Sequence, residues 1–407
     1  MKRCGRHSIV RGLALLLLGA AARAADSPAP ADRIAHLEKM HATAPDNGAI
    51  MYELAVAETG VGRHADAIRW LQKAAAAGYA FDPTNPAFKP LSKFEDFKEL
   101  ERRLSEPPPA HTSALAFRIT QPDLIPEGIA WDPVGRSLYV GSLYKKKIVR
   151  VGPDGAVRDF VRSGQDGLWT VLGMTVDEKR RTLWVVSAAD GREGEAAGSS
   201  GLFAFDLETG SLRGKHVLGG PSEKHLFNDL VMTPDGDIYL TDSAAGAIWR
   251  LPNQASALEK FLPPGTFDYP NGLAFDRGRL YVADFVKGVS IVDLETRTVR
   301  PLRHARDVSL HDIDGLYFYK GSLVAIQNGP GMERVALFRL NPSGEGVEAV
   351  RIIESRNPDF RTPTTGAIVG SELFYLANTQ LTDLGDDGKL APGARLRDVL
   401  ILKAPLD

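Results

Sequence analysis

One phrase recurs six times in the second part of the chain, and it constrains the fold more than any other feature. It consists of a polar residue, a glycine, a short apolar strand, a turn and a second strand of the Leu-Tyr-Val type. The copies begin at Glu127, Leu172, Asn228, Asn271, Asp314 and Thr365. In the third copy, Leu230 is aligned with the glycine of the others. The spacing of about 40–60 residues is typical of one blade of a β-propeller.

A third strand follows each copy, so we predict an all-β six-bladed β-propeller over residues 115–407. A sandwich or barrel gives no reason for one phrase to repeat six times. The segment 115–119 (LAFRI) precedes the first copy and is itself strand-like. We expect it to form the outer strand of the last blade, beside residues 399–403, because this pairing closes the ring and covers a sheet edge.

The part of the chain before the propeller has a helical pattern. We predict a small α-helical domain over residues 25–106 and a proline-rich linker over residues 107–114. Two amphipathic helices are broken at Gly60 and Gly62. The segment 50–79 resembles one tetratricopeptide repeat, which implies a binding surface for a protein partner. A plain helical hairpin without a binding role explains the pattern equally well.

The first 24 residues have the layout of a secretory signal peptide. Basic residues precede a short apolar run over residues 12–22, and Ala22-Arg23-Ala24 is a small-x-small cleavage motif. The apolar run is too short to span a bilayer, and no later stretch is long enough. We therefore expect a periplasmic or secreted protein without a membrane span.

Cleavage at this motif changes the charge and the cysteine content. The segment 1–24 holds five basic residues and no acidic ones, so 44 of the 49 basic residues remain against 51 acidic ones, a net charge of −7. A nucleic-acid partner, which requires a basic surface, is not expected. The only cysteine, Cys4, is removed. The mature chain then has no disulfide, thiolate nucleophile or cysteine-based metal site.

The residues that begin the six copies are expected at one mouth of the central channel, because the first strand of each blade lines that channel. Several are oxygen donors: Glu127, Asn228 with Asp229, Asn271 and Asp314. Converging oxygen donors favour a hard divalent cation, Ca²⁺ above all, with Zn²⁺ and Mg²⁺ left open. Each residue taken singly is also a common turn former. Their shared register on one rim favours the metal site.

Other polar residues are expected near the same mouth. Ser142, Asp242, Asp284 and Asn328 end second strands, where they either orient the ligands or hydrogen-bond between blades. His225 and His311 lie three residues before Asn228 and Asp314. Each is either a general base or a solvated loop histidine.

Four phrases carry a resemblance to a known family: PEGIAWDP, FNDLVMTPDGDIYLTDS, YPNGLAFD and DIDGLYF. The region over residues 117–403 resembles the gluconolactonase/regucalcin (senescence-marker protein) family. The resemblance implies one divalent metal held by Glu127, Asn228, Asn271 and Asp314, with Asp314 also as the catalytic base. It implies hydrolysis of a lactone or another ester.

Two departures from the family bear on the substrate. Sugar-lactone members have an arginine two residues before the third-copy asparagine, where this chain has Leu226, and a glycine where it has Leu230. These changes favour a more hydrophobic lactone or another ester. The first functional hypothesis is an exported metal-dependent hydrolase. The second is a non-catalytic binding or scaffold propeller with a structural calcium and a helical partner-binding module.

Overall fold

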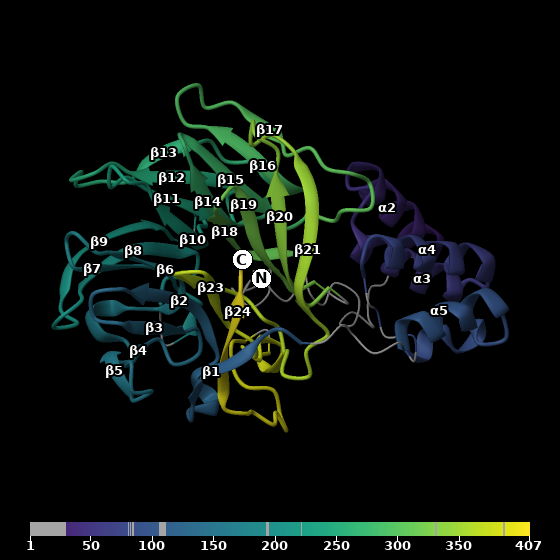
Figure 1. Cartoon of the computed structure of the whole chain (residues 1–407), viewed down its shortest axis with the longest axis horizontal. Helices are drawn as coiled ribbons and strands as arrows, with labels where there is room; N and C mark the ends of the chain where they lie inside the picture. Colours follow the sequence, from purple (N-terminus) through teal and green to yellow (C-terminus); the bar gives the residue numbers. More distant parts are fainter. Residues whose placement is uncertain are drawn as a thin grey trace, which may run out of the picture.

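The computed structural model describes residues 30–407, except residues 80, 82, 84, 106–110, 193–194, 221, 330–331 and 386. The predicted signal peptide and the prolines of the predicted linker lie outside the described residues. Within the described part, the chain forms a group of helices and six four-stranded sheets arranged around a central axis (Figure 1). This is the predicted six-bladed β-propeller with N-terminal helices.

Each copy of the repeated phrase supplies the first two strands of one sheet. The first strands are β2 (Pro126–Asp132), β6 (Thr170–Asp177), β10 (Phe227–Met232), β14 (Pro270–Asp276), β18 (Ile313–Tyr319) and β22 (Gly366–Val369). The second strands are β3 (Ser137–Ser142), β7 (Thr182–Ala188), β11 (Ile238–Asp242), β15 (Arg279–Asp284), β19 (Ser322–Gln327) and β23 (Glu372–Leu376).

The third and fourth strands complete each sheet toward the outside. The third strands are β4 (Ile148–Val151), β8 (Ser199–Asp206), β12 (Ala247–Leu251), β16 (Gly288–Asp293), β20 (Arg334–Leu340) and β24 (Val399–Pro405). The fourth strands are β5 (Val157–Val161), β9 (Leu212–Gly219), β13 (Glu259–Leu262), β17 (Val299–Pro301), β21 (Val347–Ser355) and β1 (Ala114–Ile119).

The ring closes as predicted, because β1 pairs antiparallel with β24 in the last sheet. Phe117 lies opposite Ile401 and Ile119 opposite Val399. Ile119 is fully buried, in an apolar cluster shared by the first and last blades. The strand therefore covers a sheet edge and holds the two ends of the propeller together.

The apolar core lies between neighbouring sheets rather than at the central axis. Between the first two blades, Tyr139 packs with Leu183 and Phe203, and each side chain is fully buried. Similar clusters join the other blades. Close packing between sheets fixes each blade against the next, and so fixes where the first strands begin.

Helices form the N-terminal part, named here the helical domain (residues 30–105). Its elements are α2 (Pro30–Thr43), α3 (Gly48–Gly60), α4 (His64–Ala76), the 3₁₀ helix η1 (Pro86–Leu91) and α5 (Glu95–Ser105). The predicted break between two helices lies between α3 and α4, where Gly62 has a φ of +80°. None of the described helices is long and apolar enough to cross a membrane. The tetratricopeptide resemblance stays a prediction.

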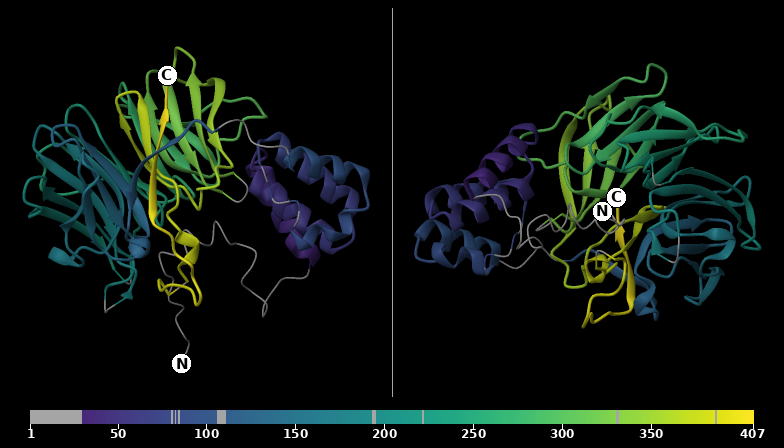
Figure 2. Two further views of the ribbon diagram at one scale, coloured as in Figure 1. Left: turned by 60° about the horizontal axis from the view of Figure 1, so that its bottom comes forward. Right: turned by 180° about the vertical axis from the view of Figure 1, so that it is seen from behind.

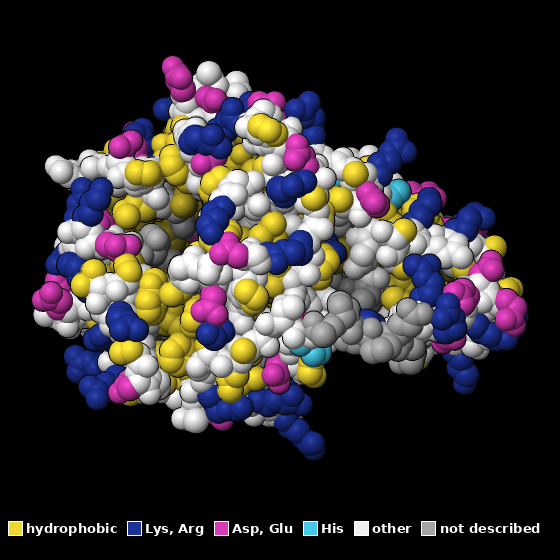
Figure 3. All heavy atoms as spheres, viewed as in Figure 1, with side chains coloured by type: hydrophobic (Ala, Val, Ile, Leu, Met, Phe, Trp, Pro, Cys, Tyr) yellow, Lys and Arg dark blue, Asp and Glu magenta, His cyan; other side chains and the backbone are white. Residues whose placement is uncertain are grey.

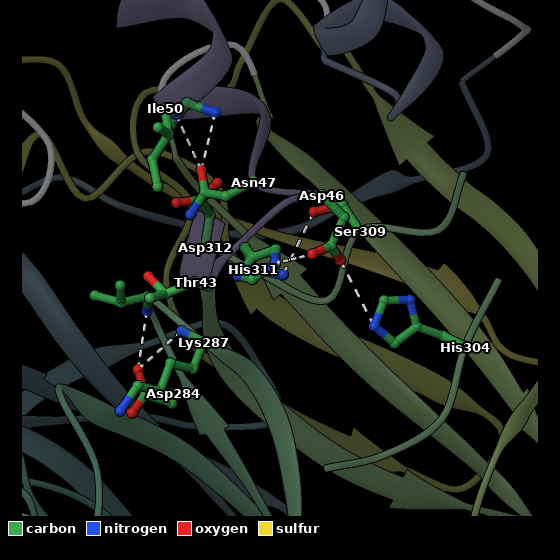
Figure 4. Close-up of polar contacts among 12 residues, drawn as sticks. Thr43, Asp46, Asn47, Ile50, Asp284, Lys287, His304, Ser309, His311 and Asp312 are labelled. Carbon is green, nitrogen blue, oxygen red and sulfur yellow. Dashed lines mark hydrogen bonds and ion pairs between the residues drawn. The ribbon is translucent and has the colours of Figure 1, made fainter. Parts of the chain in front are cut away.

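The helical domain lies against one side of the propeller, next to the sheet that contains β21 (Figures 1 and 2). The Asn47 side chain caps α3 by accepting from Ala49 N at 3.0 Å and Ile50 N at 3.2 Å. The preceding residue, Asp46, contacts His311 of the propeller, with 2.8 Å between Oδ1 and Nε2 (Figure 4). The second oxygen of Asp46 lies 3.6 Å from His304 Nε2.

Charged side chains of both signs cover the face in view in Figure 3, interspersed over the propeller and the helical domain. Among the described residues, exposed ion pairs form within one blade or one helix, such as Lys287 with Asp268 and Lys98 with Glu95. Exposed pairs of this kind contribute little to stability. The pair of His311 and Asp46 is mostly shielded from solvent and joins the helices to the propeller, so it is expected to contribute more to docking than the exposed pairs do.

We predict that the docking of the helical domain depends on pH through this pair. Burial opposes the charge of each group, but their mutual attraction outweighs it, so the pKa of His311 is raised above 6.5 and that of Asp46 is lowered below 3.8. The stability that protonated His311 adds to the docked protein is fully present below pH 6.5 and is lost as pH rises through its raised pKa. The stability that ionised Asp46 adds is fully present above pH 3.8 and is lost as pH falls through its lowered pKa.

The measurement is the melting temperature of the wild type and of Asp46→Asn across the neutral range. Between about pH 6 and about pH 8.5, the wild type should lose more stability than the variant. The other charged groups near the pair, Asp312, His304 and Arg334, are the same in both proteins. Asp66→Asn on the exposed side of α4 is the matched control. Equal pH profiles for wild type and Asp46→Asn would contradict the prediction.

Candidate metal centre

A β-bulge begins the first strand of five blades and sets the direction of the side chain there. In the first blade, Pro126 lies opposite Ser142 and Ile129 opposite Val140, so Glu127 and Gly128 fall in the bulge. The same irregularity begins β6, β10, β14 and β18. Glu127, Asn228, Asn271 and Asp314 all occupy the first bulge position. A bulge re-aims side chains, and here it gives four oxygen donors one shared position.

The register corrects the alignment of the third copy by one residue. Phe227 lies opposite Asp242 and Leu230 opposite Leu240, so Asp229 occupies the position that Gly128 has in the first blade. The assignment of Leu230 to the glycine position was therefore wrong. Aligning Leu230 with the apolar residue of the other copies, such as Ile129, would have revealed a carboxylate in place of a glycine.

The first strands meet at the mouth at distances that exclude a side chain. A Cβ on Gly128 would lie 1.9 Å from Leu172 O, and one on Gly272 would lie 2.2 Å from Asp314 O. Glycine is therefore required at both positions. The Thr365 hydroxyl donates to Glu127 O and joins the last copy to the first. The six copies thus begin in one closed ring.

The carboxylates in this ring have oxygens without a hydrogen-bond partner. Glu127 and Asp314 are each 1% exposed. Both Oε atoms of Glu127 and Oδ1 of Asp314 are buried without a partner. The Asp314 Oδ2 accepts from Asn328 Nδ2 at 2.6 Å, and Asn228 Nδ2 donates to Ser243 Oγ at 3.0 Å. Buried acceptors that lack a donor are rare in proteins and call for a bound cation or its equivalent.

The electrostatics of the ring lead to the same conclusion. Burial, with the charges of Asp314 and Asp229, raises the pKa of Glu127 well above its usual range. Burial raises the pKa of Asp314 to about 6 against the opposing bonds from Asn328 and Asn271. The pKa of Asp229 is raised to about 7, chiefly by burial. Three carboxyl groups so close together disfavour joint ionisation unless a positive charge balances them.

The residues present fit a divalent ion with oxygen ligands. Ca²⁺ accepts carboxylate and asparagine oxygens at about 2.3–2.6 Å, which matches the chemistry of Glu127, Asn228, Asn271 and Asp314, named here the metal set. No group of three or more histidine, cysteine, aspartate and glutamate side chains among the described residues is able to hold a metal. The candidate centre therefore depends on the two carboxamides as well as the two carboxylates.

The polar ends of the second strands have different roles. Asn328 contacts a member of the metal set, Asp314, as one of the two sequence hypotheses expected. Asp242 and Asp284 instead accept from backbone N–H groups, those of Leu226 at 3.0 Å and Asp268 at 2.7 Å. Ser142 likewise bonds to backbone groups. The third-blade counterpart of Asn328 is Ser243, which the sequence analysis missed.

The two histidines are neither solvated nor directed at the metal set. His225 is 4% exposed, and its Nδ1 lies 2.5 Å from Asp242 Oδ2. His311 is 2% exposed and pairs with Asp46. Both rings therefore hold loops in place through a carboxylate, and the solvated-loop interpretation was wrong.

A tyrosine that the sequence analysis overlooked lies beside the ring. The Tyr269 hydroxyl is buried without a hydrogen-bond partner. Burial and the negative charges of Asp314 and Glu127 raise its pKa, so the hydroxyl keeps its proton. Tyr269 precedes Asn271 by two residues, just as Leu226 precedes Asn228. That shared position is the signal by which it could have been found.

A cavity of about 520 Å³ lies between the first strands. Apolar side chains make up much of its wall, among them Trp131, Met174, Met232, Phe275 and Phe318. Asp229 also lines it, whereas the members of the metal set do not. The ring of the metal set therefore separates this apolar interior from the mouth at which the blades' first strands begin.

Comparisons with known proteins support the fold. Neither a scan of protein-family models nor a search of curated proteins gave a match. The calcium-binding protein regucalcin from Agrobacterium tumefaciens is similar in structure, at 17% identity and a TM-score of 0.50 over 73% of this chain and 97% of that one. A luciferin-regenerating enzyme matches at 14% identity and a TM-score of 0.50 over 72% of this chain and 95% of that one.

A gluconolactonase from Xanthomonas campestris is also similar, at 20% identity and a TM-score of 0.48 over 74% of this chain and 99% of that one. At these identities the likeness is one of fold. The two structures with a TM-score of 0.50 therefore support the propeller fold that the repeated phrase predicted.

We predict that divalent ions stabilise the protein through Glu127. In the metal-free protein, burial and the neighbouring carboxylates disfavour ionisation of Glu127, which costs stability at neutral pH. Glu127→Gln removes this cost and should melt higher than the wild type in chelator. Added Ca²⁺ at 100 times its Kd should stabilise the wild type by about 2.7 kcal/mol and the variant by much less. Thermal melts with and without Ca²⁺ measure both effects.

Glu178→Gln is the matched control, because Glu178 is exposed and outside the metal set. It should respond to Ca²⁺ as the wild type does. An equal response of Glu127→Gln and wild type would remove Glu127 from the metal set.

Proposed function

We propose that this chain is an exported metal-dependent hydrolase of the lactone or ester type, acting in the periplasm or outside the cell. The observation that carries the proposal is the set of buried, unpartnered oxygens on Glu127 and Asp314, in register with Asn228 and Asn271. The repeated phrases, which resemble those of gluconolactonase and regucalcin, support the same conclusion. Export rests on the composition of residues 1–24.

The metal set would hold one divalent cation, Ca²⁺ by the chemistry of its donors. When bound, such a cation polarises an ester carbonyl and stabilises negative charge on its oxygen. The fold of the chain places the four donor side chains together, so they need not rearrange when the cation binds. The close first strands and the bulges fix the donors before any ligand arrives.

Asp314 is the proposed general base. Asn328 holds one carboxylate oxygen at 2.6 Å and leaves the other without a protein partner. Burial raises the pKa of Asp314 to about 6 in the metal-free site, and a bound cation would lower it, so the carboxylate would be ionised and free to accept a proton at neutral pH. In this role Asp314 takes a proton from the water that attacks the carbonyl carbon. The bond between the carbonyl carbon and the ring oxygen then breaks, and the ring oxygen takes the proton back from Asp314 and leaves as a hydroxyl group.

Tyr269 is proposed to donate a hydrogen bond to the substrate. Its hydroxyl is protonated, has no partner in the protein and lies within the electrostatic influence of Glu127 and Asp314. A donor of this kind stabilises the oxygen on which negative charge develops. Leu226, which stands where sugar-lactone members have arginine, belongs to the same apolar cluster as Tyr269. This surrounding favours a hydrophobic lactone or ester over a sugar lactone.

One observation favours the alternative of a binding propeller with a structural calcium. The unpartnered oxygens of Glu127 and Asp314 and the Tyr269 hydroxyl are closed to solvent, as expected of an ion that only holds blades together. In that case the helical domain would be the part that binds a partner. Turnover, rather than metal content, separates the two functions.

We expect chelator-sensitive hydrolysis of at least one member of a panel of aliphatic and sugar lactones and simple esters. Asp314→Asn should lower kcat at least about 10²-fold, because it loses the base, while the far-ultraviolet circular dichroism spectrum stays unchanged. Asp237→Asn, which changes an aspartate that pairs with Arg250 directly before β11 and away from the metal set, is the comparison. Metal binding without turnover on the whole panel would favour the structural-calcium alternative.

For Tyr269→Phe we expect kcat to fall on the order of 10²-fold with metal affinity retained, because one oxyanion donor is lost. Steady-state kinetics and Ca²⁺ titration measure the two quantities separately. Adding Phe285→Tyr to Tyr269→Phe places a hydroxyl at a different position, so kcat of this double variant should stay as low as that of Tyr269→Phe. Loss of metal affinity in Tyr269→Phe would instead make the hydroxyl part of the metal centre.

A further inference from the structure

The helical domain reaches the propeller directly beside Asp314. Tyr79 follows α4, and its hydroxyl donates a hydrogen bond to Asp312 Oδ2. Both side chains are 2% exposed. Asp312 lies two residues before Asp314 in the chain. A side chain of the helical domain is therefore linked to a member of the metal set through one carboxylate and a two-residue step of backbone.

The backbone at Asp312 needs such support. Its φ is +58°, in the left-handed region, which aspartate enters more readily than most residues but still at a cost in free energy that its surroundings offset. Its N–H donates to Phe285 O at 3.2 Å and its C=O accepts from Asn328 N at 3.0 Å. Tyr79 supplies a buried side-chain contact in addition. These bonds determine the direction in which the chain enters β18 and presents Asp314.

The second support of Asp314 also rests on the helical domain. Asn328, which donates to Asp314 Oδ2, is followed four residues later by Met332. Met332 is 1% exposed and packs with Ala74 and Tyr79 of the helical domain. Both segments that hold the Asp314 carboxylate are thus packed against the helices.

Arg334 extends this packing into the blade. A Cβ on Gly78 would lie 2.7 Å from Arg334 Nη1, so the helical domain approaches the guanidinium closely. Arg334 Nε donates to Gln327 Oε1 at 2.7 Å, and Gln327 Nε2 donates to His311 O at 2.6 Å. These bonds tie the end of β19 to the segment that leads into β18.

The first blade offers an internal comparison. Ile125, two residues before Glu127, is also left-handed, with a φ of +41°. Leu143 N donates to Ile125 O at 3.0 Å, as Asn328 N does to Asp312 O. Ile125 is packed by Leu143 and Leu381 within the propeller. In the fifth blade the corresponding residue is the polar Asp312, and the side chain that packs against it is Tyr79 of the helical domain.

We infer that the helical domain is a structural part of the metal centre, with Tyr79 as a positioning residue that holds Asp314 through Asp312. The inference rests on one part of the proposed function, namely that Asp314 binds the metal, and adds the residues that position it. It assigns the helices a role within the chain, whether or not they also bind a partner.

The test compares Tyr79→Phe with Tyr52→Phe in the full chain. Tyr52 lies within the helical domain, where its hydroxyl accepts from Asn85 at 2.6 Å, so its loss controls for a general weakening of the helices. We expect Tyr79→Phe to weaken Ca²⁺ affinity by about 10- to 100-fold, as supporting residues of metal ligands do. Tyr52→Phe should leave it unchanged. Calorimetric titration with Ca²⁺ and hydrogen exchange of the segment 309–316 are the readouts.

Two further variants separate positioning from general destabilisation. Asp312→Asn keeps an acceptor oxygen and should retain most of the affinity, whereas Asp312→Ala should match Tyr79→Phe. The double variant of Tyr79→Phe and Asp312→Ala should lose no more than either alone, because both remove the same contact. Additive losses would overturn the inference.

The outcomes also separate this inference from the proposed function. Wild-type affinity in folded Tyr79→Phe, or equal losses in Tyr79→Phe and Tyr52→Phe, would overturn it while the metal centre stands. A wild type that binds no Ca²⁺ would sink the metal centre. In that case faster exchange of the segment 309–316 in Tyr79→Phe alone would still support Tyr79 as its anchor, and unchanged exchange would refute it.

Discussion

The close approach of the six first strands at one mouth of the channel is the constraint on which the rest of the site depends. Glycines such as Gly128 and Gly272 remove the side chains that would hold the strands apart, and the apolar packing between blades brings the strands together. The strand starts then form one ring, and the bulges turn the donor of each blade into it. The ring gathers carboxylates that repel one another, so stability must come from the blades, where apolar side chains are packed away from the charged centre.

A left-handed residue precedes each of the two carboxylates of the metal set. In two of the four blades that supply the metal set, the residue two positions before the donor is left-handed without being glycine, and both donors are carboxylates. Ile125 is held by apolar packing inside the propeller, whereas Asp312 is held by Tyr79 of the helical domain. Strained residues persist only where their surroundings over-determine them, and such residues cluster at functional sites. The packing of Ile125 and the contact of Asp312 with Tyr79 are therefore evidence that the fold specifies the direction in which the Glu127 and Asp314 side chains point.

The repeated phrase was sufficient to predict the six blades, the closing strand and the shared register of four donors, because each follows from strand period and chain order alone. Three features were missed, two of them because the available sequence signal was weak and one because no local signal exists. The alignment of the third copy failed because Asp229 breaks the glycine pattern, and only strand register resolved it. Tyr269 opens the phrase YPNGLAFD, but its unpartnered hydroxyl became evident only from its surroundings. The contacts of Tyr79 and His311 join residues more than two hundred positions apart, which no local pattern specifies.

The helical domain changes how the two sequence hypotheses relate to each other. A module that only recruits a partner would be removable without effect on the propeller. Here its removal would leave Asp312, His311 and Arg334 without the groups that cover them. A buried aspartate in a strained conformation, deprived of its donor, would relax and move Asp314 with it. The pairing of His311 with Asp46 makes the same docking sensitive to pH, since the two charges stabilise it only while both are present. The geometry of the metal centre is thus coupled to the docking of the helices, and a partner that engaged the helices would act on Asp314 through that contact.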